Sequence, residues 1–171
     1  GKLCELGSLY RVGQFDQVSQ FVLAHPDKSW DLFVQMIQLA EHFVQSLGIN
    51  SFRVVQCPAK DLPFGATCQY FIEGLYPFFI VGGDPASAPS FKKIITCTHF
   101  SDFLSRSLEV RCGASKVQGK KAYAHMLHCS MVSSTRLLSC CLEHWQSSNG
   151  INIPSVLRPF MDHCNLIPFT H

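Results

Sequence analysis

The chain has 171 residues, enough for one domain of ordinary size and too few for two full domains. Apolar residues make up 47% of it and charged residues only 15%, which excludes intrinsic disorder, collagen-like structure and a coiled coil. The 14 basic and 12 acidic residues nearly balance, so charge alone does not indicate a nucleic-acid-binding protein. The scarcity of charge predicts apolar surface that a partner, or another part of the same protein, covers.

The cysteines indicate a reducing compartment. There are nine of them, an odd number, and Cys140 is adjacent to Cys141, a spacing too cramped for an ordinary disulfide. Free thiols inside a cell are the simpler interpretation. No apolar run approaches the ~20 residues that span a bilayer, and no targeting peptide is recognisable at Gly1, so no membrane partner is predicted.

The first half of the chain predicts strands around one long helix. Alternating apolar residues predict a long strand, and three- and four-residue spacing of apolar residues then predicts a helix that Gly48 ends. Pro58, Pro63 and Gly65 indicate a loop. The expected strands are Leu9–Leu23, Ser51–Cys57, Gln69–Tyr76 and Phe91–Thr98, and the expected helix is Trp30–Leu47.

The second half predicts a basic hairpin and a strand that leads into a helix. The expected elements are a short helix Asp102–Leu108, a strand Leu108–Cys112, a hairpin tip with Lys116, Lys120 and Lys121, a strand Ala122–His128, a helix Met131–Gln146 and a short helix Pro154–Phe160. Because the connections resemble hairpins rather than βαβ crossovers, the fold class is α+β, an antiparallel sheet with helices packed on it.

Four segments resemble the seryl-tRNA synthetase family. Leu9–Gln20 is similar to the motif-two strand, Leu-Tyr-Arg-Val-His-Gln-Phe-x-Lys-Val-Glu. Leu127–Arg136, continued by Leu142–Gln146, is similar to motif three, in which Leu-Asn-x-Thr leads to an Arg and then to Leu-Glu-Asn-x-Gln. Phe91–Thr98 aligns with Phe-Arg-Glu-Val-Ser-Ser-Cys-Ser, and Leu166–Phe169 matches the family's ending.

The resemblance implies a partial class II aminoacyl-tRNA synthetase core. Residues 1–171 are expected to form the C-terminal part of a catalytic domain, with the tRNA-binding arm and the dimer-forming motif one outside this chain. The resemblance is strongest to mitochondrial seryl-tRNA synthetase-like proteins, so it implies a mitochondrial location, or otherwise a cytoplasmic one. A synthetase-like subunit, in a homo- or heterodimer, and tRNA are the implied partners.

Some nucleotide-binding positions of the family are retained. Phe15 matches the aromatic residue that stacks on adenine, and Arg136 matches the motif-three arginine on its other side. Arg11 matches an arginine near the nucleotide, and Thr96 matches a residue that contacts metal and phosphate. Without the resemblance, Phe15 would be read as a strand core residue and Arg136 as a solvated helix residue.

Other positions depart from the family. Ser19 replaces the glutamate that receives the ammonium of serine, and Lys93 replaces a metal-binding glutamate, which reverses the charge. His128 replaces the motif-three asparagine, and Gly13 replaces the motif-two histidine. The departures predict a pseudoenzyme that makes no seryl-adenylate, with a vestigial ATP site and no cofactor or metal.

Two alternatives remain open. One is an active serine–tRNA ligase that uses ATP and Mg²⁺ in a remodelled pocket, and the other is a nonfunctional fragment that cannot fold alone. An ATP–pyrophosphate exchange assay separates the first from the inactive interpretation, and a cooperative thermal transition would argue against the second.

Three further clusters have a structural and a functional interpretation. His125, His128 and Cys129 have a spacing that zinc could use on a helix, but on a strand the two histidines lie on opposite faces, which disfavours a metal site. Cys140, Cys141 and His144 are expected in the core and its flank rather than in a nucleophile pair. The lysines at positions 116, 120 and 121 are either a weak RNA-binding tip or a solvated turn.

Overall fold

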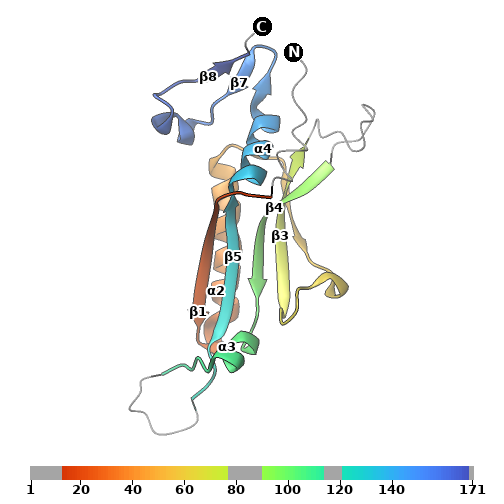
Figure 1. Ribbon diagram of the computed structural model, residues 1–171, viewed down its shortest axis with the longest axis vertical. Helices are drawn as coiled ribbons and strands as arrows, with labels where there is room; N and C mark the ends of the chain where they lie inside the picture. Colours follow the sequence, from red (N-terminus) through yellow and green to blue (C-terminus); the bar gives the residue numbers. More distant parts are fainter. Residues whose placement is uncertain (1–12, 77–89, 114–120, 170–171) are drawn as a thin grey trace.

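The computed structural model describes residues 13–76, 90–113 and 121–169. Its centre is a five-stranded antiparallel sheet with the order β1-β5-β4-β3-β2 (Figure 1). The strands are β1 (Gln17–Ala24), β2 (Phe52–Gln56), β3 (Cys68–Tyr76), β4 (Ser90–His99) and β5 (His125–Ser133). The expected α+β class with an antiparallel sheet is confirmed.

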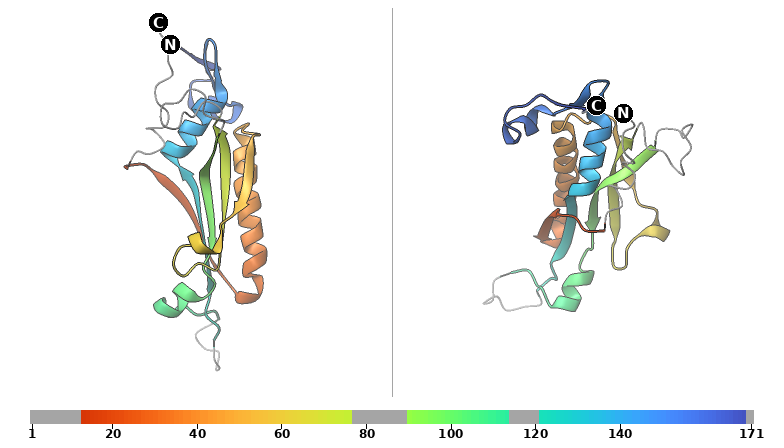
Figure 2. Two further views of the ribbon diagram at one scale, coloured as in Figure 1. Left: turned by 90° about the vertical axis from the view of Figure 1, so that its right-hand side faces the viewer. Right: turned by 45° about the horizontal axis from the view of Figure 1, so that its top comes forward.

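Two helices pack with this sheet. Helix α2 (Ser29–Ser46) runs along one side of the sheet, and α4 (Ser134–Trp145) continues directly from β5 (Figure 2). A short helix α3 (Phe103–Leu108) lies near the opposite end of β5. The remaining elements are the 3₁₀ helices η1 (Pro26–Lys28), η2 (Ala59–Asp61) and η3 (Ser155–Phe160) and a small sheet of β6 (Gln146–Ser147), β7 (Gly150–Asn152) and β8 (Leu166–Pro168).

The core lies between the helices and one face of the sheet. Buried α2 residues recur at three- and four-residue spacing and form one apolar stripe, which includes Phe33, Met36, Ala40 and Val44. This stripe packs on Ile95, Cys97, Leu127 and Cys129 of the central strands and on Cys140 of α4. Side chains alternate along each strand, so their neighbours project from the other face of the sheet.

Gly48 ends the chain's longest helical segment, as the sequence predicts. Its φ of +72° lies in the left-handed region, which glycine enters without steric cost. A Cβ at this position would overlap the indole ring of Trp145, whose Nε1 donates a hydrogen bond to the carbonyl of Leu47 at 3.0 Å. The glycine therefore allows the end of α2 to pack closely against the end of α4.

Several predicted boundaries differ from the structure. The helix expected from Met131 begins at Ser134, because β5 continues to Ser133 in register with β1. The strand expected at 108–112 is reduced to one bridge, between Arg111 and Tyr123. The strand expected at 9–23 begins only at Gln17, and its residues 9–12 lie outside the described part of the chain. Within the described residues, no helix is long and apolar enough to cross a membrane.

Candidate functional site

The face of the sheet opposite α2, which we call the open face, carries a row of polar side chains. Directly paired residues of antiparallel strands share a face. The register therefore places Ser19, Ser130, Thr96 and Phe71 in one row across four strands. The open face consists of Ser19, Gln69, Phe71, Glu73, Lys93, Thr96, Thr98, His128 and Ser130.

Hydrogen bonds fix the polar side chains of the open face. The Nε2 atom of Gln17 donates to the Oγ atoms of Ser19 at 2.8 Å and of Ser130 at 3.0 Å. The buried Nε2 atom of Gln69 donates to Oγ1 of Thr98 at 2.7 Å. These bonds connect β1 to β5 and β3 to β4, so the hydroxyl groups of Ser19, Ser130 and Thr98 are held in defined positions.

A cationic group lies where the family resemblance implies a metal-binding carboxylate. The Nζ atom of Lys93 lies 3.5 Å from the centroid of the Phe71 ring, a cation–π geometry. Glu73 is paired with Lys93 in the strand register and is the only carboxylate of the open face as defined above. Its Oε2 atom lies 2.8 Å from Nη2 of Arg53, so this carboxylate is already engaged by a cation.

Phe15 and Arg136 lie near one junction between β1, β5 and α4. The backbone N–H of Ser134 donates to the carbonyl of Asp16 at 2.9 Å, and the N–H of Asp16 donates to Oγ of Ser134 at 3.1 Å. Phe15 directly precedes this pair, and Arg136 is in the first turn of α4. The structure therefore brings the two expected adenine-binding residues to the same end of the sheet, while their role stays a prediction. Arg11 lies outside the described residues.

The two histidines of β5 lie on opposite faces, as predicted for a strand. His128 belongs to the open face and is half-buried, opposite Thr98. His125 faces α2, where its Nδ1 lies 2.8 Å from Oγ of Ser29 and its Nε2 lies 3.3 Å from Oγ of Ser101. Among the described residues, no three His, Cys, Asp or Glu side chains are grouped to hold a metal ion.

The cysteines of α4 belong to the core, as the sequence predicts. Cys140 and Cys141 are buried, and burial raises the pKa of their thiols to about 12 and about 11. Such thiols remain protonated at neutral pH and are poor nucleophiles. The half-buried ring of His144 contacts the indole of Trp145 edge to face, at a centroid distance of 5.8 Å.

The expected RNA-binding hairpin lies mostly outside the described residues. Lys116 and Lys120 are not described, and the carbonyl of Lys121 accepts a hydrogen bond from Arg111 at 3.5 Å. Arg111 itself pairs with Glu109 at 2.9 Å and thereby lowers the pKa of that carboxyl. Glu109 therefore partly neutralises the positive charge that Arg111 adds to the described part of this hairpin.

The sequence reasoning missed several residues that shape the open face. Gln17, Gln69, Glu73 and Arg53 each make a side-chain contact described above. Gln69, Glu73 and Arg53 lie outside the aligned motifs, and Gln17 lies in motif two, at its lysine position, where no role was expected for it. The alternation of Gln69, Phe71 and Glu73 along one strand was the available signal, because such a period places all three on one face.

Comparison with known proteins identifies the family. Residues 4–145 match the tRNA synthetase class II core domain (G, H, P, S and T). The chain belongs to this family. Cytoplasmic serine–tRNA ligases from Schizosaccharomyces pombe and Dictyostelium discoideum are each 36% identical to this synthetase-like chain, over 95% and 94% of its length. The human cytoplasmic enzyme is 33% identical over 94%. These matches relate the chain to the seryl-tRNA synthetases.

Solved structures confirm the class II fold. The cytoplasmic serine–tRNA ligase of Naegleria fowleri in complex with AMP has a TM-score of 0.84 at 34% identity and covers 95% of this chain. Seryl-tRNA synthetase from Pyrococcus horikoshii complexed with ATP has a TM-score of 0.82 at 28% identity. The synthetase-like chain spans only about a third of its relatives, 34% of the Schizosaccharomyces pombe enzyme and 37% of the Naegleria fowleri chain.

Proposed function

We propose that this chain is part of a catalytically inactive seryl-tRNA synthetase-like protein that binds tRNA, a synthetase-like partner subunit, or both. The observation that carries the proposal is the charge of the open face. Lys93 and Ser19 occupy the positions where the family resemblance implies two glutamates, and both lie on this face. A sheet that keeps its fold while its site loses these carboxylates is suited to binding rather than to serine activation.

The side chains of the open face do not fit a magnesium ion. Mg²⁺ prefers oxygen ligands and in nucleotide sites is held by carboxylates together with substrate phosphates. The open face offers an ammonium from Lys93, and its carboxylate, Glu73, is 9% exposed and paired with Arg53. Two like unit charges 4 Å apart repel by about 4 kcal/mol at an effective dielectric constant of about 20, and Mg²⁺ carries two. A catalytic step through a bound metal therefore does not fit these residues.

The serine substrate also lacks its expected counter-charge. Ser19 Oγ accepts a hydrogen bond from the amide of Gln17, so it contributes a neutral hydroxyl to the open face. The ammonium could still donate to this hydroxyl, but it would find no negative charge there, and an ammonium without a counter-charge in a desolvated site is costly. A hydroxyl at this position therefore weakens the binding of an amino acid's ammonium, in addition to the loss of the metal.

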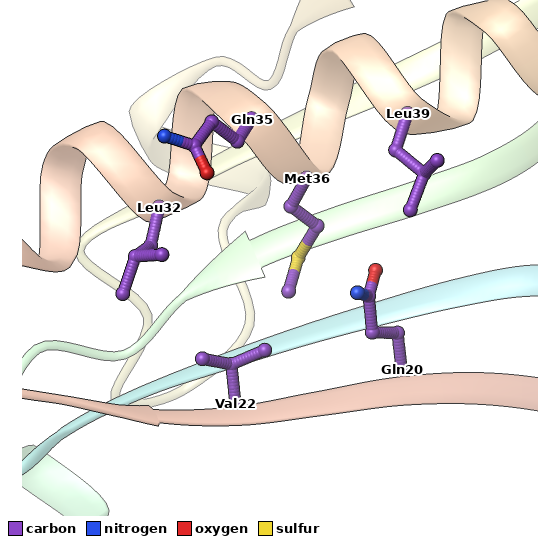
Figure 3. Close-up of a pocket in the computed structure, with 6 residues that line it drawn as sticks. All are labelled: Gln20, Val22, Leu32, Gln35, Met36 and Leu39. Carbon is purple, nitrogen blue, oxygen red and sulfur yellow. The ribbon is translucent and has the colours of Figure 1, made fainter.

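The exposed apolar surface supports a protein partner. The edge strand β1 exposes Val18, Phe21 and Leu23, and α2 exposes Val34 and Leu39. Between β1 and α2 lies an open hollow of about 300 Å³ (Figure 3). It is lined by Gln20, Val22, Leu32, Gln35, Met36 and Leu39. These residues do not form one patch, because Phe21 pairs with His128 of the open face whereas the hollow lies on the α2 side of the sheet. Together they agree with the low charge content and support a dimer with another synthetase-like subunit.

We further propose that the protein supports mitochondrial translation. This role rests on the resemblance of the sequence alone, and the relatives named above are described as cytoplasmic enzymes.

The proposal assigns tRNA binding mainly to parts of the protein outside this chain. The lysines at positions 116, 120 and 121 add a minor, salt-sensitive contribution. Replacing all three should reduce the log–log salt slope of tRNA binding by up to about 3. An unchanged slope would assign these lysines to solubility.

Binding of ATP by the whole chain, measured calorimetrically with Mg²⁺ and with EDTA, tests the site. We expect Mg²⁺ to give no gain in ATP affinity in the natural chain. Lys93→Glu, which restores a carboxylate, is expected to make binding Mg²⁺-dependent by about 10-fold. Lys28→Glu in η1 makes the same charge change away from the open face and should have no such effect. Strong Mg²⁺ dependence of the natural chain would overturn the proposal.

An active serine–tRNA ligase with a remodelled pocket is the second candidate. The retention of Phe15, Thr96 and Arg136 favours it, because these residues match nucleotide-binding positions of the family. In that case Lys93 would have to contact a phosphate directly. Serine-dependent exchange of pyrophosphate into ATP distinguishes the two candidates, since only the ligase catalyses it.

A further inference from the structure

Two buried cysteines lie side by side in the middle of the sheet. Cys97 of β4 and Cys129 of β5 are directly paired in the antiparallel register, and both side chains face α2. Their Sγ atoms are 3.1 Å apart, and the residues are 1% and 0% exposed. The thioether sulfur of Met131 lies 3.7 Å from Sγ of Cys129.

The backbone around this pair suits a disulfide. Directly opposed residues of antiparallel strands have Cα atoms about 4.5–5.5 Å apart, inside the range of about 4.4–6.8 Å found for disulfides. An S–S bond is about 2.0 Å long, so the sulfur atoms must approach by only about 1 Å. Rotation about the Cα–Cβ bonds is the movement that closes this gap, since the general spacing of paired strands already suits a disulfide.

We propose that Cys97 and Cys129 are a redox pair that forms a cross-strand disulfide when a hydroperoxide oxidises the protein. One thiol loses its proton and attacks a peroxide oxygen, which breaks the O–O bond and, with hydrogen peroxide, releases one water and leaves a sulfenic acid. The second sulfur then attacks the sulfenic sulfur. The S–S bond forms, the S–O bond breaks, and the hydroxide leaves as a second water with the thiol proton. Two thiols are thereby oxidised and one peroxide is reduced, and an external dithiol reverses the change.

The surroundings make the pair slow to react but stable once joined. The pKa of the Cys97 thiol is raised far above its usual range. The hydrogen bond with Cys129 is the larger cause, and burial is the second. The thiolate is the nucleophile, so oxidation requires high pH or transient opening of the sheet. A disulfide buried in the core is in turn reduced slowly, so its reversal needs a strong dithiol such as dithiothreitol.

The pair lies directly behind the candidate site. In the register of β4 and β5, Cys97 and Cys129 lie between the pairs Thr96–Ser130 and Thr98–His128, which all belong to the open face. A disulfide here would fix the spacing of the two strands that carry these groups. The inference is independent of the proposed function, because it depends only on the two thiols.

Oxidation of the whole chain with hydrogen peroxide at pH 8, followed by alkylation and peptide mapping without reductant, tests the proposal. We expect a cross-link between Cys97 and Cys129, a loss of two hydrogens in mass and reversal by dithiothreitol. Closing the loop between positions 97 and 129 should raise Tm by about 10 °C. Cys140→Ala/Cys141→Ala, a matched buried pair, should retain the cross-link, and Cys97→Ala/Cys129→Ala should lose it. Over-oxidised thiols or other pairings in the natural chain, without this cross-link, would overturn the proposal.

Discussion

Removing Arg53 should destabilise the fold because it leaves the mostly buried Glu73 carboxylate of the open face without this partner. The Nε and Nη2 atoms of Arg53 lie 2.9 and 2.8 Å from Oε2 of Glu73, whose side chain is only 11% exposed. Hydrogen bonds to charged groups contribute about 1.5–3 kcal/mol, and half of the arginine is solvated, so we expect Arg53→Ala to cost about 2 kcal/mol. In a chain of this size that lowers Tm by about 4–8 °C, measurable by calorimetry.

Arg106→Ala is the matched control. Arg106 pairs with Asp102 at 2.6 Å and lies over the ring of Tyr123, as Arg53 lies over the ring of Phe91, but the Asp102 side chain is 31% exposed. An exposed pair of residues four positions apart contributes about 0.5 kcal/mol or less. Equal destabilisation by the two substitutions would refute the argument that burial of Glu73 determines the effect.

Two further predictions concern stability. Burial, with a smaller contribution from His125, lowers the pKa of His99 to about 4 from 6.5. The unfolded chain therefore binds more protons between these values, so stability should fall by up to about 3 kcal/mol as pH decreases from 6.5 to 4. Urea unfolding at pH 7 and pH 5 should show this loss, and His99→Gln should reduce it. Gly48→Ala should cost about 1–3 kcal/mol in urea unfolding, because the added Cβ meets Trp145 at a positive φ, whereas Gly13→Ala, with open space around it, should be neutral.

The sequence predicted the parts of the fold that local pattern determines. The three- and four-residue spacing around Phe33 and Met36 located α2, and the left-handed Gly48 located its end. The alternation of side chains predicted that His125 and His128 lie on opposite faces of a strand. The motifs indicated the family, and the family resemblance predicted the class II sheet. No contact between strands was predicted from the sequence.

The parts that depend on long-range pairing were less accessible. The extension of β5 to Ser133 follows from its pairing with Gln17, which lies more than a hundred residues away, so local helix propensity gave the wrong boundary. The Arg53–Glu73 pair and the contact between Cys97 and Cys129 likewise depend on strand order and register. Spacing along the chain contains no information about either.

Serine-dependent ATP–pyrophosphate exchange by the whole chain tests the central claim most directly. The reaction requires the amino acid, the nucleotide and the metal to be bound together, and Ser19 and Lys93 remove the charges that two of them need. We predict exchange no faster than a blank without protein, with the cytoplasmic human enzyme as the positive control. Exchange that depends on serine and Mg²⁺, and that is lost in Arg136→Ala, would contradict the account and identify an active ligase.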